Sequence, residues 1–406
     1  MVSPTVVPDR RGLGRYLPPL SMAIPMLIFA GASLALPLAA ARALQLTEPQ
    51  VGAWILVLYG LPALLSLLLT ARYRQPMFVG WHTQGVIVLA ALAGRVGYTD
   101  LLGALLVSGA VVAALGALGL TARLADLIPA PIVFAVVAGT LLPFVAGAFT
   151  ALGDERTVIG GTLVAYLVSR RFLGARVPAV LPALLAGLAL AWLAGRLGHA
   201  DVAWALPAPV FARPTFAPAA LAAVVPAVVP LVAFQANLTW VAYLRGQGYR
   251  PPPRAADIAT GLGMMLGALV APVPLCMGSL VVPLAAGPEA GEPQVRHWSV
   301  YAVAAGFALI ALGGALAAAL PAILPLALLV AVAGLALLGG LGQALGEVVR
   351  GPLRLGPLFA FIIASSKLAL LGLGPLFWAL VIGTAVSLAL EPAELRALRA
   401  TGAASE

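Results

Sequence analysis

The chain has 406 residues, of which 62% are hydrophobic and 9% are charged, and its mean hydropathy is +1.06. A soluble domain carries roughly 25% charged residues, so this composition excludes a soluble globular protein. The formal net charge of +9 fits basic loops that face anionic lipid on the cytoplasmic side of a membrane, and it requires no nucleic-acid partner.

Apolar segments follow one another along the whole chain, separated by short polar breaks, and the acidic residues lie in these breaks or at the ends of the apolar segments. About 20 apolar residues cross the ~30 Å hydrocarbon layer of a bilayer as a helix. We therefore predict an all-α polytopic membrane protein with about fourteen transmembrane segments, the first of which is too long for a signal-peptide core. The segments lie at 17–41, 50–71, 76–94, 99–121, 124–150, 156–170, 177–196, 217–243, 254–272, 275–287, 297–320, 321–345, 352–372 and 373–391.

The basic residues favour one orientation of these segments. If the N-terminus is cytoplasmic, the ends and loops on that side hold 17 of the 23 basic residues, the external loops hold five, and Lys367 lies inside a span. Lys and Arg gather on the cytoplasmic side of membrane proteins. The distribution therefore predicts that both termini are cytoplasmic and supports an even number of spans.

Fourteen spans divide into two sets of seven at the polar, Pro-containing connection 197–216. Because seven is odd, the second set starts from the opposite face, as in inverted-repeat transporters with a substrate site near the membrane midplane. We predict the first repeat at 1–200 and the second at 201–406. The third and tenth spans each open with Pro and carry Gly and polar residues, which predicts discontinuous helices whose positive ends form an anion site.

Three stretches of the sequence resemble the benzoate:proton symporter family. They are Arg74-Gln75-Pro76 with Gly80-Trp81-His82-Thr83-Gln84-Gly85, Phe234-Gln235-Ala236-Asn237-Leu238 with Gly248-Tyr249-Arg250-Pro251-Pro252, and Gly287-Pro288-Glu289-Ala290. The resemblance covers roughly residues 15–395 and implies the fold shared with uracil permeases and sulfate/bicarbonate anion carriers. That fold implies a core domain from 17–121 and 217–320, a gate domain from 122–196 and 321–391, and a short strand with a half-helix in spans three and ten.

The chain departs from this family in two places. Thr239 and Trp240 stand where members usually carry Pro-Gly, and the stretch 271–278 lacks the usual Gly-Gly-His and following Asn. Spans eight and ten also lack the glutamates that uracil permeases use there. The substrate is therefore left open between an aromatic carboxylate such as benzoate, another small anion and, less in keeping with the pattern, a nucleobase.

The resemblance implies a substrate site between spans one, three, eight and ten. The candidate residues are Phe29 in span one, Trp81, His82, Thr83, Gln84 and Gly85 in span three, Gln235 and Asn237 in span eight, and Cys276, Met277, Gly278 and Ser279 in span ten. His82 can either take the coupling proton or make a structural hydrogen bond to a backbone carbonyl. Gln235 and Asn237 lie two positions apart, so on a regular helix they face different directions.

Other polar residues in or near the spans have alternative interpretations. Lys367 needs a cavity or a partner at membrane depth, and the resemblance assigns its span to the gate, away from the ligand. Asp257 and Arg254 near the start of span nine are typical of a helix cap and a topology charge. The three histidines fall in separate segments, so we predict no metal site and no cofactor.

The sequence thus predicts a secondary active transporter of the bacterial cytoplasmic membrane that imports a small organic anion such as benzoate together with a proton. Its other expected partners are membrane lipid and, in a homodimer, a second copy of the chain. A uniporter, channel or exchanger for another small anion remains the alternative. An enzyme is excluded because no span carries clustered carboxylates, a Ser/His pair or a His-Glu-x-x-His helix.

Overall fold

The computed structural model describes residues 12–172, 179–199, 206–313, 323–366, 368, 370 and 375–403. Lys367 lies outside the described residues, as does the end of the predicted segment 297–320.

The first half of the chain forms helices interrupted by one short strand. In chain order its elements are η1 (Gly12–Tyr16), α1 (Leu17–Ser33), α2 (Ala35–Ala43), α3 (Glu48–Ile55), η2 (Leu56–Gly60), α4 (Leu61–Tyr73), β1 (Val79–Trp81), α5 (Thr83–Ala91), α6 (Tyr98–Leu118), α7 (Leu120–Leu127), α8 (Ala130–Asp154), α9 (Arg156–Phe172) and α10 (Val180–Leu193).

The second half repeats the pattern of helices with one strand. Its elements are α11 (Pro218–Pro230), η4 (Leu231–Asn237), α12 (Leu238–Gly246), α13 (Pro253–Gly267), β2 (Leu275–Met277), α14 (Val282–Ala286), η5 (Pro288–Ala290), α15 (Trp298–Leu312), α17 (Leu326–Arg350), α18 (Leu355–Ser365), α19 (Pro375–Leu390) and α20 (Pro392–Ala403).

Each of the fourteen predicted segments contains at least part of one described helix. Within the described ranges, six helical stretches are long and apolar enough to cross a membrane: Gly14–Ala43, Glu48–Tyr73, Tyr98–Leu118, Ala130–Asp154, Pro218–Gly246 and Leu326–Arg350. The prediction of a helical multi-span membrane protein is therefore confirmed, while fourteen crossings stay a prediction. Two helices differ from the sequence expectation: α7 stands alone at the join of two predicted segments, and α20 follows the last one.

The two short strands lie in the third and tenth segments, where the resemblance implies them, and they pair with each other. β1 runs antiparallel to β2, with Val79 opposite Met277, Gly80 opposite Cys276 and Trp81 opposite Leu275. Two further backbone bonds extend the ladder, from His82 N–H to the Pro274 carbonyl and from the Gly278 N–H to the Phe78 carbonyl, both at 2.8 Å. The pairing joins the two halves of the chain at the centre of the protein.

The eighth segment is distorted where its polar residues lie. Pro226 and Pro230 interrupt α11, and the chain continues as a π-helix, η4, before α12 begins. Proline removes a backbone donor and disturbs the regular ladder, and π-helical turns inside helices are frequent at functional sites. Gln235 and Asn237 both belong to this π-helical segment.

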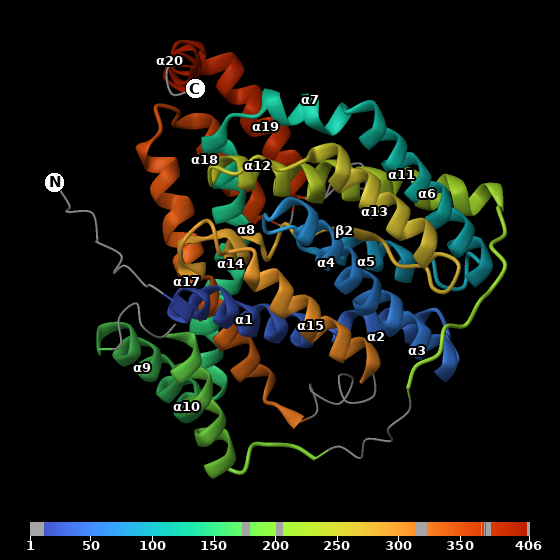
Figure 1. Ribbon diagram of the computed structural model, residues 1–406, viewed down its shortest axis with the longest axis horizontal. Coiled ribbons are helices and arrows are strands. Elements are labelled where there is room, and N and C mark those ends of the chain that lie inside the picture. The colour runs from blue at the N-terminus through green and yellow to red at the C-terminus, as the bar shows by residue number, and fades with distance from the viewer. Residues whose placement is uncertain are drawn as a thin grey trace.

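Two groups of helices pack side by side in Figure 1. One group has α8 packed against α17, α18 and α19, and the other has α6 packed against α11 and α13, with α1 and α15 crossing the middle of the view. Small residues allow close approach in the second group: a Cβ on Gly261 would lie 2.6 Å from the Ala113 backbone nitrogen, so α6 and α13 meet backbone to backbone.

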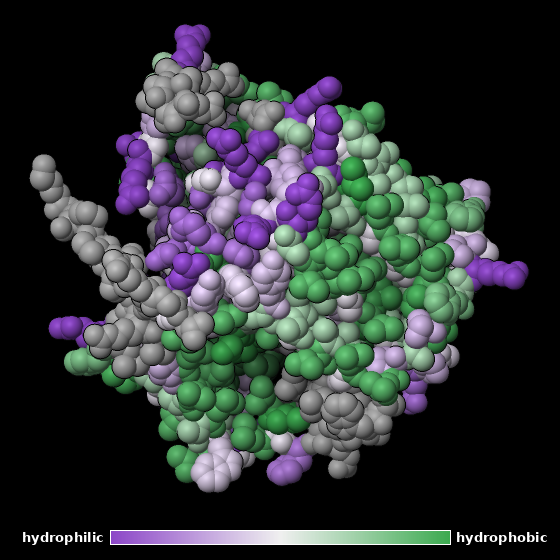
Figure 2. Space-filling model, in the orientation of Figure 1, coloured by the Kyte–Doolittle hydropathy of each residue, from purple (hydrophilic) through white to green (hydrophobic). Residues whose placement is uncertain are grey.

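The surface is largely apolar, as a protein that faces lipid requires. Figure 2 shows hydrophobic residues over most of the lower and right parts of one face, with hydrophilic residues gathered at the upper left. Large side chains such as Leu68 on α4 and Phe172 at the end of α9 are 56% and 76% exposed. In water such a surface would aggregate, so it indicates contact with the bilayer.

Candidate substrate site

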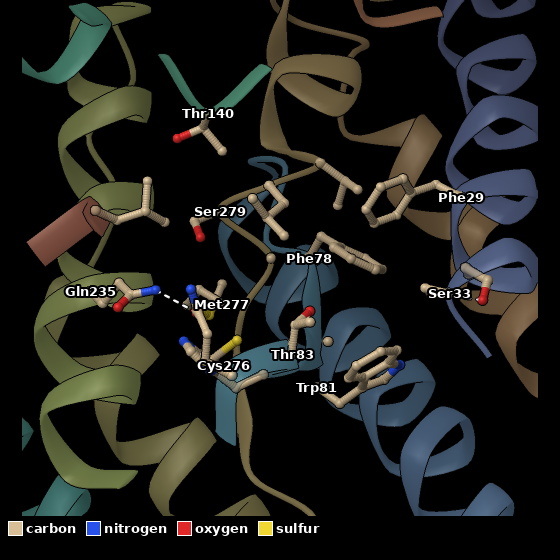
Figure 3. A pocket seen from close by; sticks show the side chains of 18 of the residues that line it. Phe29, Ser33, Phe78, Trp81, Thr83, Thr140, Gln235, Cys276, Met277 and Ser279 are labelled. Atoms are coloured by element: carbon tan, nitrogen blue, oxygen red, sulfur yellow. Dashed lines mark hydrogen bonds between the residues drawn. The ribbon is translucent and has the colours of Figure 1, made fainter. Parts of the chain in front are cut away.

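A cavity of about 350 Å³ lies beside the paired strands. Its size is within the range of small-molecule pockets. Figure 3 shows side chains from several elements around it, with Phe29 and Ser33 from α1 on one side and Gln235 from η4 on the other. The lining residues are Met26, Phe29, Ala30, Ser33, Phe78, Gly80, Trp81, His82, Thr83, Gln84, Ile87, Thr140, Phe144, Gln235, Cys276, Met277, Gly278, Ser279, Leu280, Val281, Phe307, Ala364, Pro375 and Leu376.

The cavity brings together ten of the twelve residues predicted from the sequence. Phe29, Trp81, His82, Thr83, Gln84, Gln235, Cys276, Met277, Gly278 and Ser279 all line it. The other two, Gly85 and Asn237, do not. Gly85 packs against Pro274, the residue before β2, where a Cβ would lie 2.7 Å from Pro274 Cγ. Asn237 is completely buried and accepts the Met277 N–H of β2.

His82 is the N-cap of α5 and is 4% exposed. Its Nδ1 accepts a hydrogen bond from the Gly85 N–H at 3.1 Å, and its ring also hydrogen-bonds the Leu231 backbone. A nitrogen that accepts an N–H bond is unprotonated, so the geometry fixes one neutral tautomer. Protonation at Nδ1 would break the cap of α5.

The start of α5 leaves backbone donors beside the cavity. The Gly85 N–H is used by His82 and the Val86 N–H by the His82 carbonyl. Among the described residues, the N–H groups of Thr83 and Gln84 have no acceptor. Free N–H groups at a helix N-terminus carry the positive end of its dipole and bind anions. The second half-helix, α14, has only five residues and begins five residues after β2 ends, so it is shorter than the resemblance implies.

An amide pair in the cavity wall joins the two halves of the chain. Gln235 Nε2 donates to Gln84 Oε1 at 2.5 Å, which is the dashed line in Figure 3. The Gln235 Oε1 atom is buried and has no partner within the described residues. Buried polar atoms without partners are rare in folded proteins. This atom therefore marks a place where a ligand group or water is expected.

The wall of the cavity that faces Gln235 is aromatic (Figure 3). Phe29 of α1 meets Phe144 of α8 edge to face, with ring centroids 5.4 Å apart, and Phe78 meets Phe307 of α15 at 5.3 Å. Trp81 completes this wall. Such rings offer faces and edges to a planar aromatic ligand.

The lining carries no carboxylate, Lys or Arg side chain among the described residues. Its polarity comes from amides, hydroxyls, the His82 imidazole and backbone N–H groups. An anion in this cavity would thus be held by dipoles and hydrogen bonds, without a formal positive charge.

Several lining residues are not predicted from the sequence. Met26, Ala30 and Ser33 share a helix face with Phe29, and the spacing of three and four residues is a signal that could have found them. Thr140 and Phe144 of α8, Ala364 of α18 and Leu376 of α19 come from helices that the resemblance assigns to the gate. Their segments are largely apolar, so no local pattern distinguishes the residues that face the cavity.

Asp257 is a correction to the sequence analysis. The N-cap of α13 is Pro252 and makes no side-chain cap bond, so Asp257 is not a helix cap. It lies one turn inside α13, with no exposed surface. The predicted N-cap is wrong because α13 begins at Pro253, four residues before Asp257.

Comparison with known proteins gives relatives over most of the chain. The protein is similar to the inner membrane protein YdcO of Escherichia coli (strain K12), at 29% identity over 340 residues, covering 83% of this chain and 86% of that protein. It is similar to the benzoate membrane transport protein of Acinetobacter baylyi, at 26% identity over 355 residues, covering 85% and 87%.

Among solved structures, the chain is similar to that of SLC26A9, at 13% identity and a TM-score of 0.44. The match covers 90% of this chain and 64% of that one, so the chain spans less than two thirds of that protein's length.

The helical multi-span fold with a partly polar cavity beside the paired strands fits a membrane transport protein, and the family comparison shows this class. The chain belongs to the benzoate membrane transport protein family (BenE), whose model matches residues 20–389. It is accordingly a membrane transporter and not an enzyme.

Proposed function

We propose that the protein is a secondary active transporter that carries a small aromatic carboxylate such as benzoate, with a proton, into a bacterial cell across the cytoplasmic membrane. The observation that carries this proposal is the lining of the cavity, which combines free N–H groups at the start of α5 with aromatic rings. The family and the two relatives, one named for benzoate transport and one for the inner membrane, support it.

In this proposal the carboxylate binds at the N-terminus of α5. The N–H groups of Thr83 and Gln84 would donate to it, and Ser279 and the amides of Gln84 and Gln235 line the same cavity. Hydrogen bonds to an ionised acceptor are roughly twice as strong as neutral ones. A site with several such donors can therefore hold an anion without Lys or Arg.

The aromatic ring of the ligand would lie between Phe29, Phe78 and Phe144. Burying a ring of this size contributes a few kcal/mol by area, and edge-to-face contacts add about 0.5–1.5 kcal/mol each. This wall supports an aromatic carboxylate over sulfate or bicarbonate, because a small hydrated anion would leave the rings without a partner.

For the transport movement, we propose fourteen spans in two inverted repeats of seven, 1–200 and 201–406. The core domain would comprise 17–121 and 217–320, and the gate domain 122–196 and 321–391. The packing of α8 with α17, α18 and α19, apart from α6 with α11 and α13, supports this division. The cavity is lined from both sets of helices. Sliding of one set against the other would expose it to each face in turn.

The test is uptake of labelled benzoate, an aliphatic carboxylate, uracil and sulfate into proteoliposomes that contain the purified protein, with and without an inward proton gradient. We expect benzoate to accumulate only with the gradient. Uptake of another compound in place of benzoate would overturn the substrate class. Benzoate flux that is indifferent to the gradient would replace the symporter with a uniporter or channel.

A further inference from the structure

Asp257 is a fully buried carboxylate one turn from the start of α13, without an ion pair among the described residues. It lies on α13 and has no exposed surface. Within the described part of the chain, none of the ion pairs involves it. Ionisable residues inside membrane segments are costly, and by default they mark transport pathways or proton relays.

A short chain of hydrogen bonds connects this carboxylate to the wall of the substrate cavity. Asn237 Nδ2 donates to Asp257 Oδ1 at 2.8 Å and to Thr260 Oγ1 at 2.9 Å. Asn237 Oδ1 accepts the Met277 N–H at 2.8 Å. Because Met277 belongs to β2 and lines the cavity, one side chain separates Asp257 from the site. The amide nitrogen and the amide oxygen of Asn237 thus both make hydrogen bonds.

The second oxygen of the carboxylate is unsatisfied. Asp257 Oδ2 is buried without a hydrogen-bond partner, and so is Thr121 Oγ1, although the Thr121 hydroxyl faces the carboxyl group. Such a pair of orphan atoms calls for an explanation. Oδ2 can take a proton here without giving up a hydrogen bond, and the Thr121 hydroxyl is placed to donate to Oδ2 when the carboxyl is ionised.

Among the described residues, no charged side chain pairs with the carboxyl group of Asp257. The groups that face the carboxyl are Asn237 from η4, Thr121 from α7 and the backbone of α6 at Gly116, where a Cβ would lie 2.5 Å from Asp257 Cβ. The charged side chains on the packed elements make other contacts or no ion pair. Arg254 lies over Gly119, and Asp100 accepts a hydrogen bond from Thr215. Arg72 stacks on Tyr73, and Arg123 has no ion pair in the described ranges. β2 brings the titratable Cys276, which lines the cavity.

His82 is less suited to carry the proton. Its ring is held on both sides, by the Gly85 N–H and the Leu231 backbone, so a further proton would displace the cap of α5. Asp257, by contrast, gains a proton without losing a partner. We propose that Asp257 binds the coupled proton and that Asn237 links its charge to strand β2 of the substrate site. This inference rests on the proposed proton-coupled function.

Electrostatic repulsion explains how the proton on Asp257 and the bound carboxylate are coupled. With Asp257 ionised, its negative charge and that of a bound carboxylate repel each other through a medium of low dielectric constant. With Asp257 protonated, this repulsion is absent and the anion binds more tightly. Linkage requires the reverse as well, so binding of the anion favours uptake of the proton. Proton and anion would then cross together with no net charge.

The experiment compares benzoate affinity of the purified protein across about pH 5.5–8, where benzoate stays ionised because a carboxylic acid has an ordinary pKa near 4. For the wild type, we expect affinity to rise toward low pH by about 5- to 150-fold, the usual range for coupled sites. For Asp257→Asn, we expect tight binding at every pH with less than about a twofold change. His82→Gln should keep the wild-type slope even if its affinity is lower.

A transport assay separates binding from coupling. Asp257→Asn should exchange labelled benzoate for unlabelled benzoate across proteoliposomes, yet fail to accumulate it when a proton gradient is applied. If Asp257→Asn keeps the wild-type pH slope and accumulates benzoate, the inference is wrong while the symporter proposal stands. If the wild type shows no benzoate binding or no pH slope, the proposed function itself fails.

A second variant covers the case in which Asp257→Asn does not fold. Thr121→Val removes the hydroxyl that faces Oδ2 and leaves the carboxylate in place. Loss of a polar neighbour disfavours the ionised form, so the midpoint of the affinity–pH curve should move to higher pH. An unchanged midpoint in a well-folded Thr121→Val protein would contradict the assignment.

Discussion

Arg170 and Glu289 join two parts of the protein that are far apart in the chain. Arg170 Nη1, on the last turn of α9, lies 3.2 Å from Glu289 Oε1 in η5, and the Tyr166 hydroxyl accepts a second bond from the same nitrogen at 3.1 Å. In the proposed architecture α9 belongs to the gate and η5 to the core. The pair would therefore have to separate if the two domains slide past each other on this side.

We expect Glu289→Gln to change transport more than stability. The side chains of the pair are 58% and 33% exposed, and exposed ion pairs contribute about 0–1 kcal/mol. Unfolding temperature should therefore change little, while the rate of benzoate uptake changes because one conformation loses a contact. Glu347→Gln is the matched control, since Glu347 pairs with Arg350 at 3.2 Å within the single helix α17. Equal effects of both variants on uptake would contradict a role in domain movement.

The pKa of Glu289 gives a pH dependence with a definite sign. Burial raises the pKa of this carboxyl above its ordinary value of 4.5, although Arg170 lowers it in part. A carboxyl with a raised folded-state pKa favours the folded state fully below its ordinary pKa, and this advantage is lost as pH rises through the folded-state pKa. As pH rises from acidic to neutral, the unfolding temperature of Glu289→Gln should therefore increase relative to that of the wild type. A difference that is constant with pH would contradict the raised pKa.

Local sequence signals were enough to predict the broken spans. Pro76 and Pro272 open both of them, Gly and polar residues follow, and the strands β1 and β2 lie in these stretches. Ten of the twelve site residues that the resemblance implied line the cavity, and eight of these ten lie in the two stretches that carry β1 and β2. The pattern of Pro and Gly acts on the backbone within a few residues, so it can be recognised without knowledge of the fold.

Other features depend on contacts that a single sequence does not reveal. Gln235 faces Gln84 whereas Asn237 faces β2 and α13, a difference set by the π-helical turn after Pro230. Asp257 looks like a helix cap in the sequence, and its burial follows from the close approach of α6 at Gly116. Apart from Thr140, the cavity-facing residues of α8, α18 and α19 are apolar residues in apolar helices, so only tertiary packing selects them.

Gly85 should be sensitive to a single added methyl group. In Gly85→Ala the new Cβ would lie 2.7 Å from Pro274 Cγ, so α5 has to move away from the strand that carries the site. Overpacking of this kind costs about 1–3 kcal/mol. If this cost falls on the binding-competent position of α5, benzoate affinity should fall by about 5- to 150-fold, since 1.4 kcal/mol corresponds to a factor of ten. Gly346→Ala on α17, where a Cβ meets nothing within 4 Å, should bind as the wild type does, and wild-type affinity in a folded Gly85→Ala protein would contradict the placement of the site.

Glu391 should stabilise the start of α18. Its carboxylate accepts hydrogen bonds from the N–H groups of Arg354, Leu355 and Gly356 and from the Ser387 hydroxyl. Hydrogen bonds to a charged group contribute about 1.5–3 kcal/mol, so Glu391→Gln should lower the unfolding temperature clearly. Glu394→Gln, an exposed position on α20, is the control and should have little effect. If both variants unfold alike, the carboxylate does not hold this helix end.

Phe144 tests whether the aromatic wall recognises the ligand. It lines the cavity from α8 and meets Phe29 edge to face, so Phe144→Ala removes part of the surface proposed to bind the ring. We expect benzoate affinity to fall by about 0.5–1.5 kcal/mol from the lost aromatic contact, with more from the lost apolar burial, and affinity for an aliphatic carboxylate to fall less. Phe149→Ala is the matched control, because Phe149 lies on the same helix and is 53% exposed on the apolar surface. Equal losses for benzoate and the aliphatic carboxylate would mean that Phe144 supports the cavity without reading the ring, since a collapsed cavity does not distinguish between the two ligands.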